Sequence, residues 1–120
     1  MNALGPLEAA VMDTLWHATE PARVRDVLDA LAPHRTPAYT TVMTVLDNLH
    51  RKGWVVRELD GKAYRYQPAF SREEAAAQAL RDVLDATGDP AAVLLHFARS
   101  ASRKELAALR RALEERRSKR

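Results

Sequence analysis

The stretch TPAYTTVMTVLDNLHRKGWVV, residues 36–56, combines the spacing of a helix with that of a strand. Apolar residues recur in it three or four positions apart up to Gly53 and then become consecutive, which indicates a helix followed by a strand. The residues predicted to form the buried face of the helix are Val42, Val45, Leu46 and Leu49.

Residues at both ends of this stretch favour a helix of defined length. Thr36 is predicted to be the N-cap, and Pro37 then occupies the first helical position, where its missing N–H has no partner to lose. Arg51 and Lys52 suit the negative end of the helix dipole, and Gly53 is predicted to stop the helix.

The opposite face of the predicted helix carries polar groups that suit nucleic acid. At 100° per residue, Thr40, Thr44, Asp47 and Arg51 face away from the apolar stripe, with Thr41 and Asn48 on one flank. Hydroxyl, amide and guanidinium groups hydrogen-bond to phosphates and base edges, and threonine methyls contact thymine. A solvated face gains nothing from threonine, a modest helix former. We therefore predict that this helix enters the major groove of DNA.

Asp47 is the exception on this face, because a carboxylate repels phosphate. Its predicted role is either to accept a hydrogen bond from a cytosine amine or to keep Arg51 in place.

Residues 54–68 are predicted to form a β-hairpin. Asp60-Gly61 is a strong turn signal between two short segments, and Tyr64 and Tyr66 would share one face of the second strand. Lys62 at the tip is expected to contact backbone phosphates, with Arg57 and Arg65 behind it. The alternative for both arginines is ion pairing with Glu58. The residues predicted to contact DNA are Thr36, Tyr39, Thr40, Thr41, Thr44, Asn48, Arg51, Lys62 and Arg65.

Two further helices are predicted before this stretch, at residues 6–16 and 23–32. Three helices followed by a hairpin is the order of a winged helix-turn-helix, which we assign to residues 1–70. The expected fold class is mainly α with a small β-hairpin wing.

Residues 71–120 are predicted to form three more helices, two of which begin with capping boxes at Ser71 with Glu74 and at Ser102 with Glu105. Their apolar faces are large for so short a segment, so we expect a homodimer, the commonest oligomer. The alternative is that these helices fold back on the first domain. The predicted dimerisation residues are Leu80, Val83, Leu84, Leu94, Leu95, Phe97, Leu106, Leu109 and Leu113.

Composition narrows the function classes. The 120 residues include no cysteine, which excludes disulfides, thiolate metal sites and cysteine nucleophiles. The four histidines lack the spacing of metal ligands, and no catalytic or phosphate-binding motif occurs, so we expect no enzyme activity, no metal and no cofactor. With neither a transmembrane run nor a signal peptide, the chain is expected to be cytoplasmic.

The net charge of +3 is unevenly distributed. Six Lys and Arg against three Asp and Glu give residues 34–70 a net charge of +3, and nine against three give residues 99–120 a net charge of +6. Residues 1–33 and 71–98 are each at −3. A basic block inside the folded region is consistent with a polyanionic partner, although it also serves solubility.

Three segments together resemble the BlaI/MecI/CopY family of bacterial repressors, the penicillinase repressors. They are LEAAVMDTLW (residues 7–16), TPAYTTVMTVLDNLHRKGWV (residues 36–55) and GKAYRYQP (residues 61–68). The resemblance covers almost the whole chain. It implies a homodimer that binds a palindromic DNA operator through an N-terminal winged helix, with a C-terminal helical dimerisation region.

The resemblance also implies a route of induction. In family members that control β-lactam resistance, a membrane sensor responds to the drug and the repressor is cut in its dimerisation region. His96-Phe97 stands where staphylococcal-type repressors have the cleaved asparagine–phenylalanine pair. The metal response of the copper-responsive branch needs a C-terminal cysteine cluster, which this chain lacks. Many members have arginine at the position of Asn48, so we expect a shifted operator preference.

Two alternatives to a DNA-binding repressor stay open on sequence alone. A winged helix can be a protein-interaction module without a DNA role. The C-terminal region could also sense a small molecule, although no residue cluster identifies a ligand.

Overall fold

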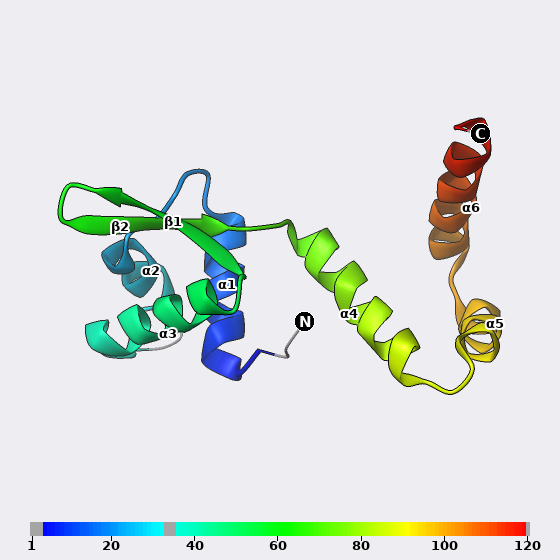
Figure 1. The fold of residues 1–120 in the computed structure, drawn as a ribbon, viewed down its shortest axis with the longest axis horizontal. Helices are drawn as coiled ribbons and strands as arrows, with labels where there is room; N and C mark the ends of the chain where they lie inside the picture. Colours follow the sequence, from blue (N-terminus) through cyan, green and yellow to red (C-terminus); the bar gives the residue numbers. More distant parts are fainter. Residues whose placement is uncertain (1–3, 33–35, 120) are drawn as a thin grey trace. The chain divides into compact units, whose positions relative to one another are not determined.

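The computed structural model describes residues 4–32 and 36–119, and Figure 1 shows their order along the chain. The contacts divide the chain into two compact units, Met1–Ala79 and Leu80–Arg120, each of which is described by itself. The elements are α1 (Pro6–His17), α2 (Val24–Leu31), α3 (Tyr39–Arg51), β1 (Val55–Asp60), β2 (Ala63–Pro68), α4 (Arg72–Ala86), α5 (Pro90–Ser100) and α6 (Arg103–Ser118).

The core of the first unit lies where α1, α2 and α3 meet the base of the hairpin. Val42, Leu46 and Leu49 are fully buried, and Val45 is half-buried, which confirms the predicted stripe of α3. The stripe packs in one cluster with buried side chains of α1, α2 and the hairpin: Val11, Met12, Leu15, Val24, Val27, Leu31, Trp54, Val55 and Tyr66.

The start of α3 differs from the prediction. Its N-cap is Ala38, whose carbonyl accepts from the N–H groups of Thr41 and Val42 at 3.0 and 3.1 Å, and not Thr36. Thr36 and Pro37 precede the helix in a segment without regular structure. Ala38 has the extended backbone of an N-cap, with φ of −68° and ψ of 152°, and the helix begins after it.

The hairpin is confirmed, with its turn shifted by one residue. Asp60 pairs with Ala63, so Gly61 and Lys62 are the two turn residues rather than Asp60 and Gly61. Gly61 has a φ of 68°, a left-handed value that glycine adopts at little steric cost.

Backbone hydrogen bonds also attach β2 to the connection between α1 and α2. The N–H of Ala22 donates to the carbonyl of Tyr66 at 2.9 Å, and the N–H of Tyr66 donates back at 2.8 Å. This exchange fixes the base of the hairpin against the helices.

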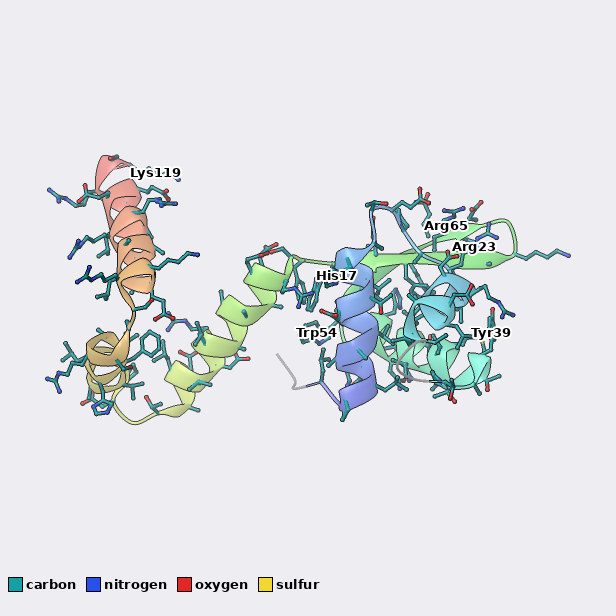
Figure 2. The ribbon with its side chains drawn as sticks, turned by 180° about the vertical axis from the view of Figure 1, so that it is seen from behind. His17, Arg23, Tyr39, Trp54, Arg65 and Lys119 are labelled. Carbon is teal, nitrogen blue, oxygen red and sulfur yellow. The ribbon has the colours of Figure 1, made fainter. Side chains whose placement is uncertain are left out.

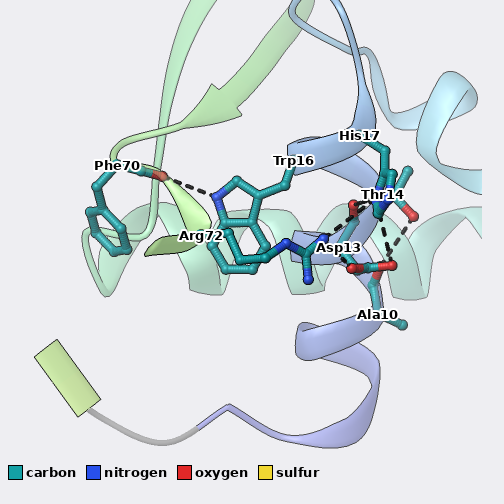
Figure 3. Close-up of polar contacts among 7 residues, drawn as sticks. All are labelled: Ala10, Asp13, Thr14, Trp16, His17, Phe70 and Arg72. Atoms are coloured by element: carbon teal, nitrogen blue, oxygen red, sulfur yellow. Dashed lines mark hydrogen bonds and ion pairs between the residues drawn. The ribbon is translucent and has the colours of Figure 1, made fainter. Parts of the chain in front are cut away.

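An aromatic cluster links α1 to the segment after β2 (Figure 3). The indole N–H of Trp16 donates to the carbonyl of Phe70 at 3.0 Å, and the Trp54 ring lies 5.2 Å from the Phe70 ring. The guanidinium of Arg72 lies over the Trp16 ring at 5.1 Å and pairs with Asp13 at 2.5 Å. The first turn of α4 is thereby fixed to α1.

The C-terminal helices begin as predicted. Ser71 with Glu74 forms a capping box before α4, Asp89 caps α5, and Ser102 with Glu105 forms a second capping box before α6. The boundary predicted between residues 70 and 71 immediately precedes α4. Of the predicted dimerisation residues, Leu84 and Leu106 are half-buried, whereas Leu80, Val83, Leu94, Leu95, Phe97, Leu109 and Leu113 are exposed.

An ion pair joins the C-terminal end of α3 to the first turn of α1. The Nζ of Lys52, after α3, lies 2.9 Å from Oε2 of Glu8 in the first turn of α1, and the Glu8 side chain is only 15% exposed. The hydrogen bond from Lys52 is the largest cause that lowers the pKa of Glu8 below its ordinary value of 4.5, followed by the bond from the Gly5 N–H.

We predict that Glu8→Gln lowers the free energy of unfolding by about 1 kcal/mol at pH 7. Because the folded-state pKa is lowered, this stability is present above the unfolded-state pKa near 4.5 and is lost as the pH falls through the folded-state value. Urea unfolding from pH 7 to pH 3 should therefore show the wild-type and variant curves converging. Glu58→Gln, at an exposed position of β1, is the matched control and should show no such convergence. Equal stability of Glu8→Gln and wild type at pH 7 would contradict the prediction.

Candidate nucleic-acid interface

The face of α3 that points away from the core carries most of the predicted DNA contacts. Thr40, Thr41, Thr44 and Arg51 are exposed, and Asn48 is half-buried. Tyr39 and Met43 lie on the side of α3 nearest the hairpin, and they are 43% and 45% exposed. The exposed surface of α3 therefore combines hydroxyl groups with an accessible thioether and a phenol ring.

The Thr44 hydroxyl is oriented within the helix. Its Oγ1 donates to the carbonyl oxygen of Thr40 at 3.0 Å. The hydroxyl hydrogen is therefore used inside the helix, and the side chain offers an acceptor oxygen and a methyl group to a partner. Such a group suits a thymine methyl or an amino group on a base edge.

Arg51 is engaged on the surface of α3 itself. Its Nη2 lies 3.5 Å from Oδ2 of Asp47 and donates to Oδ1 of Asn48. One of the two roles predicted for Asp47, keeping Arg51 in place, thus has a contact that supports it.

A groove of about 780 Å³ separates α3 from the hairpin and the start of α2. Arg25 lies beside Tyr39 in the groove, with its guanidinium 5.5 Å from the centroid of the Tyr39 ring. The cationic and aromatic side chains that line the groove are Arg23, Arg25, Arg57, Lys62, Tyr39, Tyr64 and Tyr66.

Arg23 and Arg25 were not among the residues predicted from the sequence to contact DNA. They sit at the N-terminal end of α2, and no spacing along the chain places that end beside the hairpin. Figure 2 shows the labelled side chains of Arg23 and Arg65 close together along the hairpin, and Tyr39 at the start of α3. The sequence signal for them is weak: it consists of two arginines that lie two positions apart at the start of a predicted helix.

The two wing arginines do not pair with Glu58 as the alternative reading predicted. Arg57 pairs with Asp47 of α3, Nη1 to Oδ1, at 3.2 Å. Neighbouring strand residues point to opposite faces, so Arg57 lies on the face towards α3 and Glu58 on the other. Arg65 pairs with Asp60, Nε to Oδ2, at 2.6 Å.

Asp60 connects the wing to α2. Its Oδ2 also accepts from Nη2 of Arg23 at 3.0 Å. The hydrogen bonds from Arg23 and then from Arg65 lower the pKa of Asp60 below its ordinary value, so the carboxylate keeps its charge to a lower pH than a free aspartate does. Lys62 lies beyond this network, exposed in the turn.

Thr36 is not among the residues that line the groove, and His96 and Phe97 belong to the second unit. Thr36 is exposed but lies two residues before the N-cap of α3. His96 and Phe97 are exposed residues of α5, with Phe97 51% exposed.

In residues 4–32 and 36–119, no helix is long and apolar enough to cross a membrane. The same part of the chain has no group of three or more His, Asp or Glu that could bind a metal ion.

Comparison with known proteins gives the family. The sequence matches the penicillinase repressor family over residues 4–115. The chain belongs to the penicillinase repressor family. It is 46% identical over 118 residues to a protein of Mycobacterium tuberculosis named transcriptional regulator BlaI, an alignment that covers 96% of this chain and 86% of the relative.

Solved structures show the same fold at lower sequence identity. The monomeric form of Bacillus licheniformis BlaI in complex with the blaP half-operator has a TM-score of 0.51 at 22% identity, covering 61% of this chain and 88% of that one. Staphylococcus aureus MepR, a transcription regulator of a multidrug efflux pump, has a TM-score of 0.50 at 17% identity, covering 97% and 79%. These similarities show a winged-helix fold, as the order of helices and hairpin predicted.

Proposed function

We propose that this penicillinase-repressor family member is a sequence-specific DNA-binding transcriptional repressor that acts as a homodimer on a palindromic operator. The observation that carries the proposal is the exposed polar face of α3 beside a groove lined by four cationic side chains. An α-helix of ordinary diameter enters the major groove, where base edges present distinct patterns of donors and acceptors.

In this proposal α3 reads bases and its surroundings bind phosphates. Thr40, Thr41, Thr44, Asn48 and Arg51 face the base edges. Two cationic positions that frame the groove, Lys62 in the turn and Arg25 at the start of α2, suit the phosphates of the strand beside it. The remaining predicted contacts, Thr36, Tyr39 and Arg65, belong at the edges of this surface.

Named relatives support the proposal. The relative from M. tuberculosis carries the name of a transcriptional regulator, and the B. licheniformis protein was solved with a half-operator. A protein bound as a monomer to half of an operator is consistent with a dimer on the whole site.

The dimer is supported by the apolar surface of the C-terminal helices. On α5, Leu94, Leu95 and Phe97 are 51%, 64% and 51% exposed, and on α6, Leu109 and Leu113 are 50% and 58% exposed. Exposed apolar side chains in this number are typical of an interface, and a second copy of the chain is its simplest partner. Two copies of α3 would then read half-sites one helical turn, or a multiple of it, apart.

The exposure of α5 also bears on release from DNA. Induction by proteolysis at His96-Phe97 stays a prediction taken from the family, with a membrane sensor as the indirect partner. Its support is that both residues are exposed, although a protease would have to unwind a turn of α5 to bind this bond in extended form.

Thr44→Ala and Lys62→Ala should separate base reading from phosphate binding. Loss of the Thr44 methyl and acceptor should weaken binding to the operator by about tenfold, with little change for a scrambled duplex or in salt dependence. Loss of the Lys62 charge should weaken both duplexes alike and flatten the salt slope by about one unit. Fluorescence anisotropy at several salt concentrations measures both quantities.

Alanine is the better helix former at position 44, so circular dichroism should show an intact fold in both variants. If the two variants change operator and scrambled binding in the same way, α3 is not the reading element and its placement in the groove is wrong.

The dimer interface is tested by Leu113→Glu, with Ala108→Glu as the matched control on the other side of α6. At 100° per residue these positions lie about 140° apart around the helix. A carboxylate buried without a partner costs about 3 kcal/mol or more, which raises the dimer dissociation constant at least about 100-fold. Sedimentation equilibrium should show a monomer for Leu113→Glu and a dimer for Ala108→Glu. A dimer of unchanged affinity in Leu113→Glu would exclude this face of α6.

A further inference from the structure

We propose that Asp47 and Arg57 are positioning residues: they fix the wing to the recognition helix and orient Arg51, and they do not themselves contact DNA. This inference rests on the proposed function and adds to it how the free protein prepares its reading surface. It also decides between the two roles that the sequence left open for Asp47.

The first observation is that Arg57 is enclosed by the groove. Its side chain is 24% exposed, compared with 68% for Arg51. Its guanidinium lies over the Tyr64 ring at 4.2 Å and its Nη1 lies 3.2 Å from Oδ1 of Asp47. A guanidinium that is stacked on one face, paired at its edge and largely enclosed presents little of its surface to a phosphate.

The second observation is that Asp47 uses both of its oxygens. Oδ1 faces Arg57 of the wing, and Oδ2 faces Arg51 of α3 at 3.5 Å. Arg51 in turn donates to Asn48. These contacts join β1 to the C-terminal half of α3 in one chain of polar groups, which ends at two of the residues proposed to read bases.

Electrostatics explains why a carboxylate is tolerated on a surface that faces DNA. Asp47 lies between two arginines, so the group of three keeps a net positive charge. Exposed ion pairs add only about 0.2–1 kcal/mol to stability. A role in preorganisation fits this arrangement better, because long side chains that are ordered before binding lose less conformational entropy when DNA arrives.

The Asp47→Asn variant should bind nonspecific DNA more tightly and select the operator less well than the wild type. Asp47→Asn removes the charge that restrains Arg51 and Arg57, so both become available to phosphates. Binding to a scrambled duplex should tighten, the salt slope should steepen by about one unit for each arginine that contacts a phosphate, and the ratio of operator to scrambled affinity should fall about tenfold. A direct contact from Asp47 to a cytosine would instead weaken operator binding and leave the scrambled duplex unchanged.

Arg57→Gln should lower the ratio of operator to scrambled affinity by a similar factor. It should not flatten the salt slope, because the charge of Arg57 pairs with Asp47 and not with a phosphate. Arg57→Lys keeps the charge but loses the planar stack on Tyr64, so it should keep the slope and lose part of the ratio. The double variant Asp47→Asn with Arg57→Gln should lose no more selectivity than the stronger single variant, since both act through one contact.

The experiment is a titration of the full chain and these four variants against two duplexes, the fragment upstream of its own gene and a scrambled fragment, over a series of salt concentrations. Thermal unfolding checks that each variant is folded, and Arg57→Lys serves if Arg57→Gln is not. A salt slope flattened by one unit in Arg57→Gln would show a phosphate contact and overturn the inference. Selectivity equal to wild type in Asp47→Asn and in both Arg57 variants would overturn it as well. A wild-type protein without operator preference would overturn the proposed function together with this inference, which distinguishes the two failures.

Discussion

Burial of the stripe Val42, Leu46 and Leu49 is the constraint on which the rest of the structure depends. These three side chains are fully enclosed by α1, α2 and the base of the hairpin, so α3 has only one rotation about its axis that keeps them from water. That rotation points Thr40, Thr44 and Arg51 outward. The hydrophobic effect thereby selects the reading surface, because turning the helix by one residue would expose apolar area at about 25 cal/mol per Å².

The wing is fixed to this core by directional contacts rather than by bulk burial. Backbone hydrogen bonds between Ala22 and Tyr66 set its base, Asp60 joins it to α2 through Arg23, and Arg57 joins it to α3 through Asp47. Each contact is individually modest, but together they define the groove between helix and wing. A groove lined by arginines and tyrosines suits a phosphate backbone, which is why these structural contacts bear on function.

Local patterns in the sequence predicted much of this arrangement. The stripe of α3, the hairpin and the capping boxes at Ser71 and Ser102 each depend on residues within a few positions of one another, and the structure confirms them. Contacts between distant elements could not be predicted in this way. Glu58 looked like the partner of Arg57 and Arg65 because it is close in sequence, yet strand alternation turns Arg57 towards α3, and Asp60 is shared with Arg23. The start of α3 was predicted two residues too early because a Thr-Pro pair is typical of a helix start, whereas Ala38 caps the helix through its backbone carbonyl alone.

The decisive measurement of operator recognition is a titration of the purified chain against the fragment upstream of its own gene, with a scrambled fragment of equal length as control and two salt concentrations. We expect a dissociation constant on the order of 10⁻⁸ M or tighter for the upstream fragment, two chains bound per site, and far weaker binding to the control. Equal, weak and steeply salt-dependent binding to both fragments would show that the surface of α3 and the wing is only a nonspecific basic patch, and would contradict sequence-specific operator recognition.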